Sequence, residues 1–437
     1  MMHMKLNVKR TTLVGLAFLS ISAFWGLYDF VVPLILRDTY ALGDTWSGTV
    51  MAMDNVVALV LLPFFGALSD RCRAPMGRRK PFILGGTAAA VTLLLALPFV
   101  VRHGSLAVFL CALALLLLAM GTYRSPAVAL MPDVTPKPLR SKGNAIINLM
   151  GAIGGALSLL LVNFAVVKTT DAAGKPHEDY TLLFISVAAI MTVCIAVLMA
   201  TIRERRLVAE MEAINYGEAP DAAPVAKPDA KRKLPPEVMR SLVLILCSVS
   251  LWFMGYNAVT SAFSKYATQV WGVPSSSAAN CMLVATVGAI VSYWPIGIVS
   301  SRLGRKRVIQ FGILLMAACF LAGALLPGMH AVMYLLFALV GLGWAAINVN
   351  SFPMVVEMAS GADTGKYTGL YYTFSMSAQV LTPILSGALL EHVGYFTLFP
   401  YAMVMMLLAF ATFFFVKHGD NKPEARHGLE VLDVGDD

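Results

Sequence analysis

Charged residues are scarce in this chain. Of its 437 residues, 13% are Asp, Glu, Lys or Arg and 58% are hydrophobic, whereas a soluble globular domain carries roughly 25% charged residues. This shortage argues against one soluble core and predicts that a lipid bilayer surrounds much of the chain. The formal net charge of +8 requires no nucleic-acid partner, because most Lys and Arg fall in loops expected on one side of a membrane.

Cysteine is also rare. Its six copies are scattered at Cys72, Cys111, Cys194, Cys247, Cys281 and Cys319. Their spacing matches neither a metal site nor a redox pair, so we interpret them as small packing residues. The sequence shows no nucleotide-binding glycine loop, no zinc-ligand spacing and no serine-elbow motif. We therefore predict neither an ATP-driven pump nor an enzyme, and we expect no metal and no cofactor other than a proton as coupling ion.

Long apolar runs, in contrast, are abundant. Windows of about 20 apolar residues, the length of a membrane-spanning helix, occur twelve times. They lie near residues 11–36, 46–69, 81–101, 105–129, 141–167, 181–202, 241–269, 276–300, 308–327, 330–352, 366–390 and 394–417. The first run is long enough to span a bilayer, so we interpret it as a helix rather than as a cleaved signal peptide.

A polar stretch separates these runs into two sets of six. We therefore predict an all-α membrane protein with two pseudo-symmetric six-helix bundles, at residues 1–202 and 241–417. Residues 203–240 form a linker with a short amphipathic start and a disordered middle, and 418–437 form a polar tail. Lys and Arg concentrate in the linker, the tail and the loops on the same side. This bias predicts a multi-pass protein of the cytoplasmic (plasma) membrane with both termini in the cytoplasm.

Two related loops indicate an internal duplication. The loop after the second run reads Ser69-Asp70-Arg71-Cys72, followed after a short insertion by Gly77-Arg78-Arg79-Lys80-Pro81-Phe82-Ile83. A shorter copy, Gly297-Ile298-Val299-Ser300-Ser301-Arg302-Leu303-Gly304-Arg305-Lys306, follows the eighth run. The second copy has Ser301 where the first has Asp70, so the charges of the two loops differ.

These motifs resemble the major facilitator superfamily, and within it the sucrose/proton symporter branch related to the glycoside–pentoside–hexuronide group. The insertion between Asp70-Arg71 and Gly77 is similar to the sucrose-transporter form of this loop. Further resemblance lies in Tyr123-Arg124-Ser125-Pro126 with Asp133, in Arg140-Ser141-Lys142-Gly143-Asn144-Ala145 and in Pro353-Met354-Val355-Val356-Glu357. The resemblance covers most of the chain and is strongest in its first half.

The resemblance implies that the first loop is a conformational latch, in which Asp70 pairs with arginines and with a neighbouring helix end. The alternative is that the cluster only enforces topology. The gating residues predicted in this way are Gly66, Asp70, Arg71, Gly77, Arg78, Arg79, Arg302, Arg305 and Glu357. For Glu357, at the end of the tenth run, we expect a structural salt bridge between the two halves.

Carboxylates within the apolar runs are expected to have a specific role, because placing an ionised carboxylate at mid-bilayer costs roughly 2.5–3.5 kcal/mol of free energy. Asp29 and Asp54 lie about seven and eight residues from the outer ends of the first two runs, hence at similar depth. We interpret them as a coupled pair, one carrying a proton, or as two ligands for one solute. The alternatives are a capping role near Arg37 for Asp29 and hydrogen bonds to hydroxyl groups for Asp54. The resemblance implies that Arg124 and Asp133 join in proton coupling or sugar binding, with a gate or loop contact as the other interpretation of Asp133.

Aromatic and amide side chains supply candidate sugar ligands, because aromatic faces pack on sugar rings and polar groups fix the hydroxyls. Drawn from both halves, this predicted group comprises Trp25, Tyr28, Asn55, Tyr256, Asn257, Trp344, Asn348, Tyr372 and Gln379. Any one of these residues is equally compatible with helix packing. We expect the bilayer and a small-molecule sugar as the partners of a monomer.

The sequence thus favours a secondary active transporter that imports a sugar with protons by alternating access. A disaccharide or glycoside such as sucrose or maltose fits the resemblance. A uniporter or an exporter of a related small solute is the main alternative. A membrane sugar sensor that does not transport is a third hypothesis, which the short linker and tail do not favour.

Overall fold

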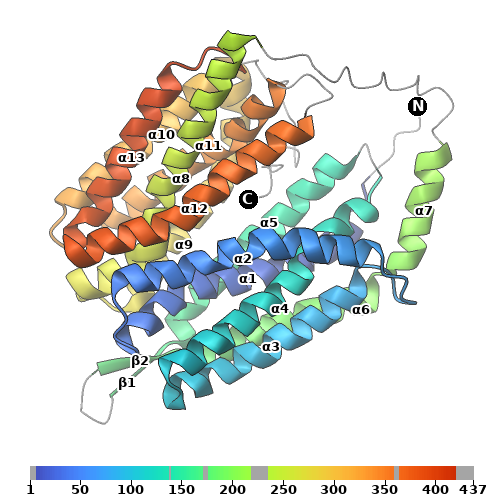
Figure 1. Ribbon diagram of the computed structural model, residues 1–437, viewed down its shortest axis with the longest axis horizontal. Coiled ribbons are helices and arrows are strands. Elements are labelled where there is room, and N and C mark those ends of the chain that lie inside the picture. The colour runs from blue at the N-terminus through green and yellow to red at the C-terminus, as the bar shows by residue number, and fades with distance from the viewer. Residues whose placement is uncertain (1–5, 137–138, 171–175, 218–234, 359–363, 420–437) are drawn as a thin grey trace. The chain divides into compact units, whose positions relative to one another are not determined.

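The computed structural model describes residues 6–136, 139–170, 176–217, 235–358 and 364–419. Within these ranges the chain is almost entirely helical, with one small two-stranded sheet (Figure 1). Eleven of the described helices are long and apolar enough to cross a membrane, and the 27-residue helix α2 (Asp44–Asp70) covers the remaining apolar run. The predicted disordered middle of the linker, and the tail beyond residue 419, lie outside the described residues.

Contacts between helices divide the chain into two compact units. The first comprises the described residues of Met1–Leu42 and Met53–Ala219. Its elements are α1 (Val8–Asp38), the greater part of α2, α3 (Lys80–His103), α4 (Leu106–Asp133), α5 (Arg140–Ala165), β1 (Val167–Thr170), β2 (Pro176–Asp179), α6 (Thr181–Thr201) and α7 (Glu204–Gly217). The strands lie at one end of this unit, and α7 runs across the helices at the opposite end, here called the α7 end (Figure 1).

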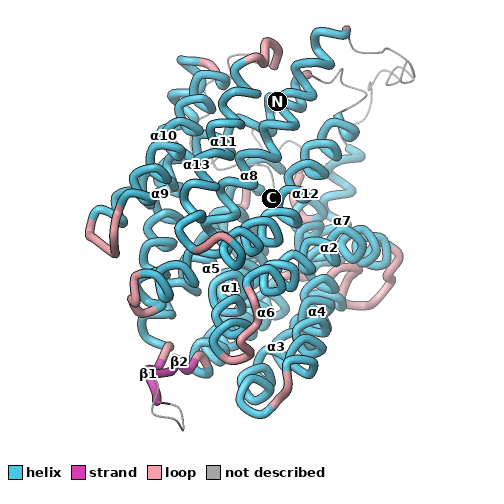
Figure 2. The backbone as a smooth tube through the Cα atoms, turned by 60° about the vertical axis from the view of Figure 1, so that its left-hand side comes forward, coloured by secondary structure: helices cyan, strands magenta, loops and turns pink. Residues whose placement is uncertain are grey.

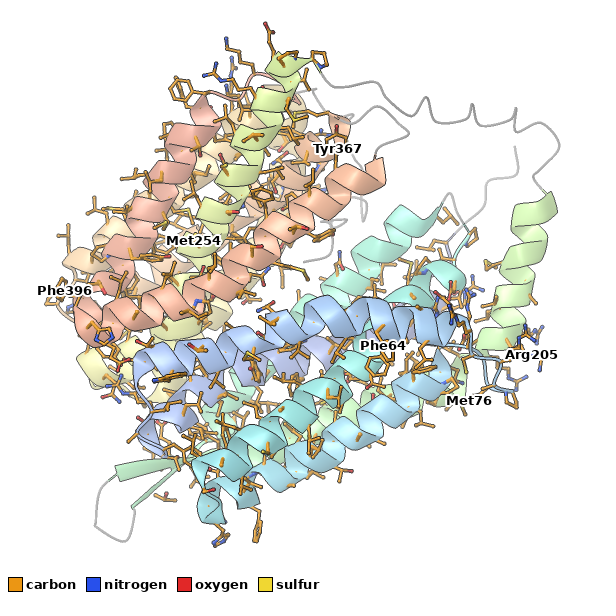
Figure 3. The ribbon with its side chains drawn as sticks, in the orientation of Figure 1. Phe64, Met76, Arg205, Met254, Tyr367 and Phe396 are labelled. Carbon is orange, nitrogen blue, oxygen red and sulfur yellow. The ribbon has the colours of Figure 1, made fainter. Side chains whose placement is uncertain are left out.

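The second unit comprises the described residues of Gly43–Ala52 and Pro220–Asp437. Its elements are the start of α2, α8 (Pro236–Val270), α9 (Ser275–Leu303), α10 (Arg305–Leu325), α11 (Val332–Glu357), α12 (Thr364–His392), the short 3-10 helix η2 (Tyr395–Thr397) and α13 (Leu398–Phe414). Tyr367 and Phe396 mark opposite ends of this unit, and Met254 lies along α8 between them (Figure 3).

Four helix pairs recur in both units. In the first unit α1 packs against α5 and α6, and α3 packs against α4 and α6. In the second unit α8 packs against α12 and α13, and α10 packs against α11 and α13. Hence α1 corresponds to α8, α3 to α10, α4 to α11, α5 to α12 and α6 to α13. The repeated arrangement is the structural counterpart of the duplication that the two related loops predict.

Glycines allow the closest of these approaches. A Cβ added to Gly86 of α3 would come within 2.8 Å of the Cβ of Tyr123 in α4, and one added to Gly312 of α10 within 2.7 Å of the backbone oxygen of Gly343 in α11. Small residues let helix backbones pack closely in a membrane, where lipid offers no hydrophobic driving force for helix association. Gly86 and Gly312 each follow a lysine, Lys80 or Lys306, by six residues, which sets the correspondence between α3 and α10.

The start of α2 belongs with the second unit because of its polar contacts there. Asp44 and Lys265 are both buried, and the Lys265 Nζ lies 2.9 Å from Asp44 Oδ1. The Tyr395 hydroxyl donates to Asp44 Oδ2 at 2.5 Å. The Thr45 backbone N–H donates to Glu391 Oε2 at 2.8 Å. Two buried charges are thus paired and hydrogen-bonded, as burial requires.

The strands β1 and β2 form an antiparallel hairpin that stands apart from the helices (Figure 2). The sequence did not predict this hairpin. Its last residue, Asp179, leads into α6, where Asp179 Oδ1 accepts a hydrogen bond from the Thr181 backbone N–H at 2.9 Å. Arg102, in the last turn of α3, donates to Asp179 Oδ2 at 2.6 Å. The hairpin is therefore fastened to both α3 and α6.

Asp179 should contribute a small, acid-sensitive part of the stability. Burial alone would raise the pKa of this carboxyl group, but hydrogen bonds from Thr181 and the charge of Arg102 outweigh burial and lower the pKa of Asp179. A lowered folded-state pKa stabilises the protein above the unfolded value of about 3.9, and this contribution is lost as the pH falls through the folded-state pKa. Asp179→Asn keeps an acceptor oxygen for the Thr181 N–H and removes the charge.

The variant should therefore lose less stability than the wild type when the pH is lowered below about 4. We expect a difference of at most about 1 kcal/mol, because the Arg102 side chain is 55% exposed and solvent screens the pair. Thermal unfolding in detergent across this pH range measures it. Identical pH profiles for the two proteins would contradict this role of Asp179.

Candidate functional site

The loop after α2 folds into an ion-pair cluster at the α7 end of the first unit, with Arg79 at its centre. The Arg79 side chain is 6% exposed. Its Nε donates to Asp133 Oδ2 at 2.9 Å and its Nη2 to Asp70 Oδ1 at 2.5 Å, while its Nη1 donates to Ser69 Oγ and to the backbone oxygen of Gly66. The planar fork of a guanidinium group suits such a set of acceptors, which a lysine could not reach together.

The two carboxylates of this cluster are held with different strength. Asp133 is 14% exposed and pairs with both Arg79 and Arg78, whose Nη2 lies 2.7 Å from Asp133 Oδ1. Asp70 is 57% exposed, so its pair with Arg79 is the more open to competition from water. The sequence grouped Asp133 with the proton-coupling residues. The structure pairs it with Arg78 and Arg79, two of the predicted gating residues, while its role in proton coupling or gating stays a prediction.

The other residues of the first loop have distinct surroundings. A Cβ added to Gly66 would lie 2.8 Å from Ser125 Oγ in α4, so Gly66 permits close packing of α2 on α4. Gly77 has a φ of +119°, which side chains rarely allow, and an added Cβ would collide with the carboxylate of Glu204. Arg71 is exposed. Glu204 and Lys80, which the sequence analysis did not select, hold this loop against α6 and α7.

The second loop places its basic residues differently. Arg302 is exposed in the last turn of α9, whereas Arg305 begins α10 and is 5% exposed. Gly304, between them, has a φ of +92° and provides the turn that a residue with a side chain would strain. Glu357 ends α11, and its side chain lies outside the described residues, so its predicted salt bridge stays a prediction.

Asp29, Asp54 and Arg124 come together within the first unit, from α1, α2 and α4. Each of the three lies close enough to act electrostatically on the other two. Asp54 Oδ1 also accepts a hydrogen bond from Asn55 Nδ2 at 2.8 Å. The Asp29 side chain is exposed although the residues on either side of it are buried. The structure thus assembles two carboxylates and one guanidinium group on three spans, while their role in proton coupling stays a prediction.

Two aromatic side chains of α1 adjoin this group. The guanidinium carbon of Arg124 lies 5.5 Å from the centroid of the Trp25 ring, in a cation–π contact. Trp25 and Tyr28 meet edge to face with centroids 5.3 Å apart. The Trp25 Nε1 and the Tyr28 hydroxyl are both buried without a hydrogen-bond partner among the described residues. A buried donor without a hydrogen-bond partner already destabilises the protein. A polar ligand that accepts a hydrogen bond from either atom would therefore break no existing one.

A second aromatic group lies in the second unit. Tyr256 of α8 and Trp344 of α11 stack with centroids 3.9 Å apart and ring planes 5° from parallel. Phe253 contacts Trp344 edge to face at 5.2 Å. The Asn257 Nδ2 is buried without a hydrogen-bond partner among the described residues, and Asn348 lies one turn beyond Trp344 and is 9% exposed. Aromatic side chains with a few polar groups beside them are typical of the lining of small-molecule sites.

The remaining predicted ligands lie on α12. Tyr372 packs against Phe352 of α11, with ring centroids 5.9 Å apart, and against Tyr371 at 5.7 Å. The Tyr371 hydroxyl is hydrogen-bonded to Ser351 Oγ at 3.0 Å. Tyr372 therefore belongs to an aromatic cluster between α11 and α12, whereas Gln379 lies two turns further along α12 and is half-buried.

Comparisons with known proteins agree with this architecture. The family described as MFS/sugar transport protein matches residues 13–416. The chain is 28% identical over 179 residues to the sucrose transport protein SUC3 of Arabidopsis thaliana, covering 36% of this chain and 28% of that protein. It is 27% identical over 158 residues to the chloramphenicol resistance protein CraA of Acinetobacter baumannii, covering 36% and 38%. It is 26% identical over 190 residues to the proton-associated sugar transporter A of Rattus norvegicus, covering 41% and 25%.

The chain thus spans well under half the length of these relatives. Among solved structures, the nucleoside transporter NupG superposes with a TM-score of 0.65 at 15% sequence identity, covering 94% of this chain and 100% of that chain. Identity this low concerns the fold alone. The repeated helix pairs, the membrane-length helices and a family match over nearly the whole chain lead to one conclusion: this multi-pass membrane protein belongs to the MFS/sugar transport protein family of the major facilitator superfamily, whose members are transporters rather than enzymes.

Proposed function

We propose that this protein is a secondary active transporter that imports a sugar together with protons by alternating access. The observation that carries the proposal is the group formed by Asp29, Asp54 and Arg124 beside the unpaired Trp25 Nε1. Charges on membrane-spanning helices are costly and are usually kept for ion or substrate pathways. A disaccharide or glycoside such as sucrose or maltose is the proposed substrate class.

The charges of this group suit proton coupling. Two carboxylates face one guanidinium group, so one negative charge is in excess when both carboxylates are ionised. A proton bound to either carboxylate removes the excess, and like charges in one site favour such protonation. The membrane potential then drives the cycle through the return of the unloaded carrier, which keeps the excess negative charge, and one proton carried across 100 mV gains about 2.3 kcal/mol.

The side chains around these charges suit a sugar. Trp25, Tyr28, Tyr256 and Trp344 offer aromatic rings. The Trp25 Nε1, the Tyr28 hydroxyl and the Asn257 Nδ2 are buried without a hydrogen-bond partner among the described residues. A sugar presents both C–H faces and hydroxyl groups, which such a mixture can bind. The partial similarity to a sucrose transport protein and to a proton-associated sugar transporter supports the same substrate class.

The proposed setting is the plasma membrane, with a monomer that has both termini in the cytoplasm. The bias of Lys and Arg toward the linker and the loops after α2 and α9 supports this orientation. In that orientation the α7 end of the first unit faces the cytoplasm and the hairpin of β1 and β2 faces outward.

Uptake into proteoliposomes tests the proposal. Labelled sucrose and maltose are offered to the reconstituted protein with an inward proton gradient and again with the gradient collapsed. Accumulation that depends on the gradient is the expected result. Equilibration that ignores the gradient would replace symport by uniport, and binding without any uptake would favour a sensor.

Export is the second candidate, and the similarity to a chloramphenicol resistance protein favours it. The same proteoliposomes distinguish the two. An exporter reconstituted in random orientation would accumulate solute in exchange for protons leaving the vesicle, so an outward proton gradient, and not an inward one, would drive uptake. Chloramphenicol and sucrose offered side by side then separate the two substrate classes.

A further inference from the structure

The first residue of α7 caps the start of α3. Glu204 is 1% exposed, and its carboxylate accepts hydrogen bonds from three consecutive backbone N–H groups. The donors are Arg78 at 2.8 Å, Arg79 at 2.9 and 3.1 Å, and Lys80 at 2.9 Å. The first N–H groups of a helix have no partner within it, and the helix dipole makes that end positive. The buried carboxylate accepts these hydrogen bonds and also places a negative charge at the positive end of the helix dipole.

Lys80 fastens the same turn to the end of α6. Its Nζ donates to the backbone oxygens of Met199 at 3.0 Å and Ile202 at 2.8 Å. Carbonyl groups in the last turn of a helix lack partners within it and favour a cation. The Glu204 carboxylate therefore joins the start of α7 to the start of α3, and the Lys80 ammonium group joins the start of α3 to the end of α6.

The second unit repeats only part of this arrangement. Lys306, the counterpart of Lys80, donates to the backbone oxygens of Phe414 at 3.0 Å and Val416 at 2.5 Å, at the end of α13. Glu204 follows the second accepting carbonyl of α6 by two residues, and His418 holds the matching position after α13. The acidic residue at this position is thus a feature of the first unit.

The carboxylate of Glu204 fixes the place of Arg79. The Arg79 backbone N–H is held by Glu204, and the Arg79 side chain is held by Asp133. Asp70, the exposed partner, lies on the other side of the loop at the end of α2. If α2 moves relative to α3, Arg79 cannot follow it, so the Asp70–Arg79 pair must break together with the Arg79 hydrogen bonds to Ser69 and Gly66 of α2. In Figure 3, Met76 and Arg205 mark the place where this loop meets α7.

We propose that Glu204 is a positioning residue of the gating motif. By capping α3 it holds Arg79 still, so that the Asp70–Arg79 pair opens and closes as a defined step of the transport cycle. This role rests on the proposed alternating-access function. It makes α7 a working part of the first unit rather than a passive connection, and it explains why the loop needs glycine at position 77, where a side chain would displace Glu204.

Labelling of Cys72 tests the proposal directly. Cys72 is half-buried in the loop between Asp70 and Gly77, so its reaction with a maleimide reports how often the loop opens. The parent protein keeps Cys72 and has its other cysteines replaced by serine. Glu204→Gln keeps the shape and loses the charge, and should react at least about tenfold faster, because charge-assisted hydrogen bonds to the loop are weakened. Glu210→Gln, at an exposed position of the same helix, is the matched control and should react like the parent.

Transport provides the second readout. Glu204→Gln should lower the maximal rate of sugar uptake and leave KM unchanged, because the sugar-binding candidates lie elsewhere. Glu204→Asp, which keeps the charge on a shorter side chain, should restore much of both the rate and the slow labelling. Equal labelling of Glu204→Gln and Glu210→Gln would overturn the proposal. If the parent itself transports no sugar, the proposed function fails, while the labelling comparison still decides the role of Glu204.

Discussion

Replacing Asp29 by asparagine should abolish proton-driven accumulation and leave sugar exchange intact. Asparagine matches aspartate in shape but takes up no proton at neutral pH. Asp54 already accepts a hydrogen bond from Asn55, whereas the exposed Asp29 carboxylate accepts none from the described residues, so we expect Asp29 to take up and release a proton the more readily of the two. At 100 mV one proton supplies about 2.3 kcal/mol, or roughly fiftyfold accumulation. The variant should reach a concentration ratio of about one.

Asp54→Asn is the matched comparison, because it makes the same chemical change at a similar depth. We expect it to lose both accumulation and exchange, since it removes the carboxylate that lies nearest the Asn55 amide and acts on Arg124, and so disturbs the whole group. Counterflow in preloaded proteoliposomes measures exchange, and gradient-driven uptake measures accumulation. If Asp29→Asn still accumulates sugar in response to the gradient, the proton is carried elsewhere and Asp29 has only a structural role.

Replacing Arg79 by glutamine should destabilise the protein far more than the same change at Arg78. Arg79 is 6% exposed and contacts both Asp133 and Asp70. Removing one partner of a buried ion pair typically costs about 3–5 kcal/mol, because the other charge stays buried without compensation. Arg78 is 36% exposed, so its loss should cost about 1 kcal/mol or less. Denaturant unfolding of the purified protein in detergent compares the two.

A double substitution shows where the Arg79 effect arises. If the cost comes from the uncompensated charge of Asp133, adding Asp133→Asn to Arg79→Gln should recover part of the lost stability. Arg79→Lys should not recover it, because an ammonium group cannot reach the same set of acceptors. Equal destabilisation by Arg78→Gln and Arg79→Gln would show that the cluster is not organised around Arg79.

Much of the fold follows from the sequence because a bilayer leaves the chain few choices. A backbone within lipid must satisfy its own hydrogen bonds, so an apolar run of sufficient length becomes a helix. The run near residues 181–202 is the helix Thr181–Thr201, and that near 81–101 is Lys80–His103. The predicted and observed helices differ at their ends, where the chain leaves the lipid and the bilayer no longer determines its conformation. The helix α8 begins at Pro236, before the predicted start at 241, because proline fits the first turn of a helix.

The parts that the sequence did not reveal depend on contacts between distant residues. Glu204 caps a helix whose first turn precedes it by more than 120 residues, and no local pattern distinguishes it from other acidic residues of the linker. Asp44 and Lys265 are 221 residues apart. The only available signal for Glu204 was its position directly after the sixth apolar run, since a charged residue at a bundle edge lies near the ends of neighbouring helices.

The residues of the candidate site were likewise only partly predictable from the sequence. Depth along the helix was sufficient to associate Asp29 with Asp54, because rise per residue is fixed. It was not sufficient to separate Asp133 from that group, since only the fold shows that Arg78 and Arg79 reach it. Tyr256 and Trp344 were predicted as sugar ligands from their residue types, but only the structure shows that their two rings stack face to face. The role of this pair as a sugar ligand stays a prediction.

The lysine contacts at the helix ends bear on how such a chain arises. In each unit a lysine at the start of α3 or α10 holds the last turn of α6 or α13, so the final helix is secured by the unit's own side chains. A gene segment encoding such a unit can be copied and joined end to end without new contacts having to evolve at the junction. After the copies are joined, the intervening sequence is free to acquire a new task, such as the one that we propose for the acidic residue that opens α7.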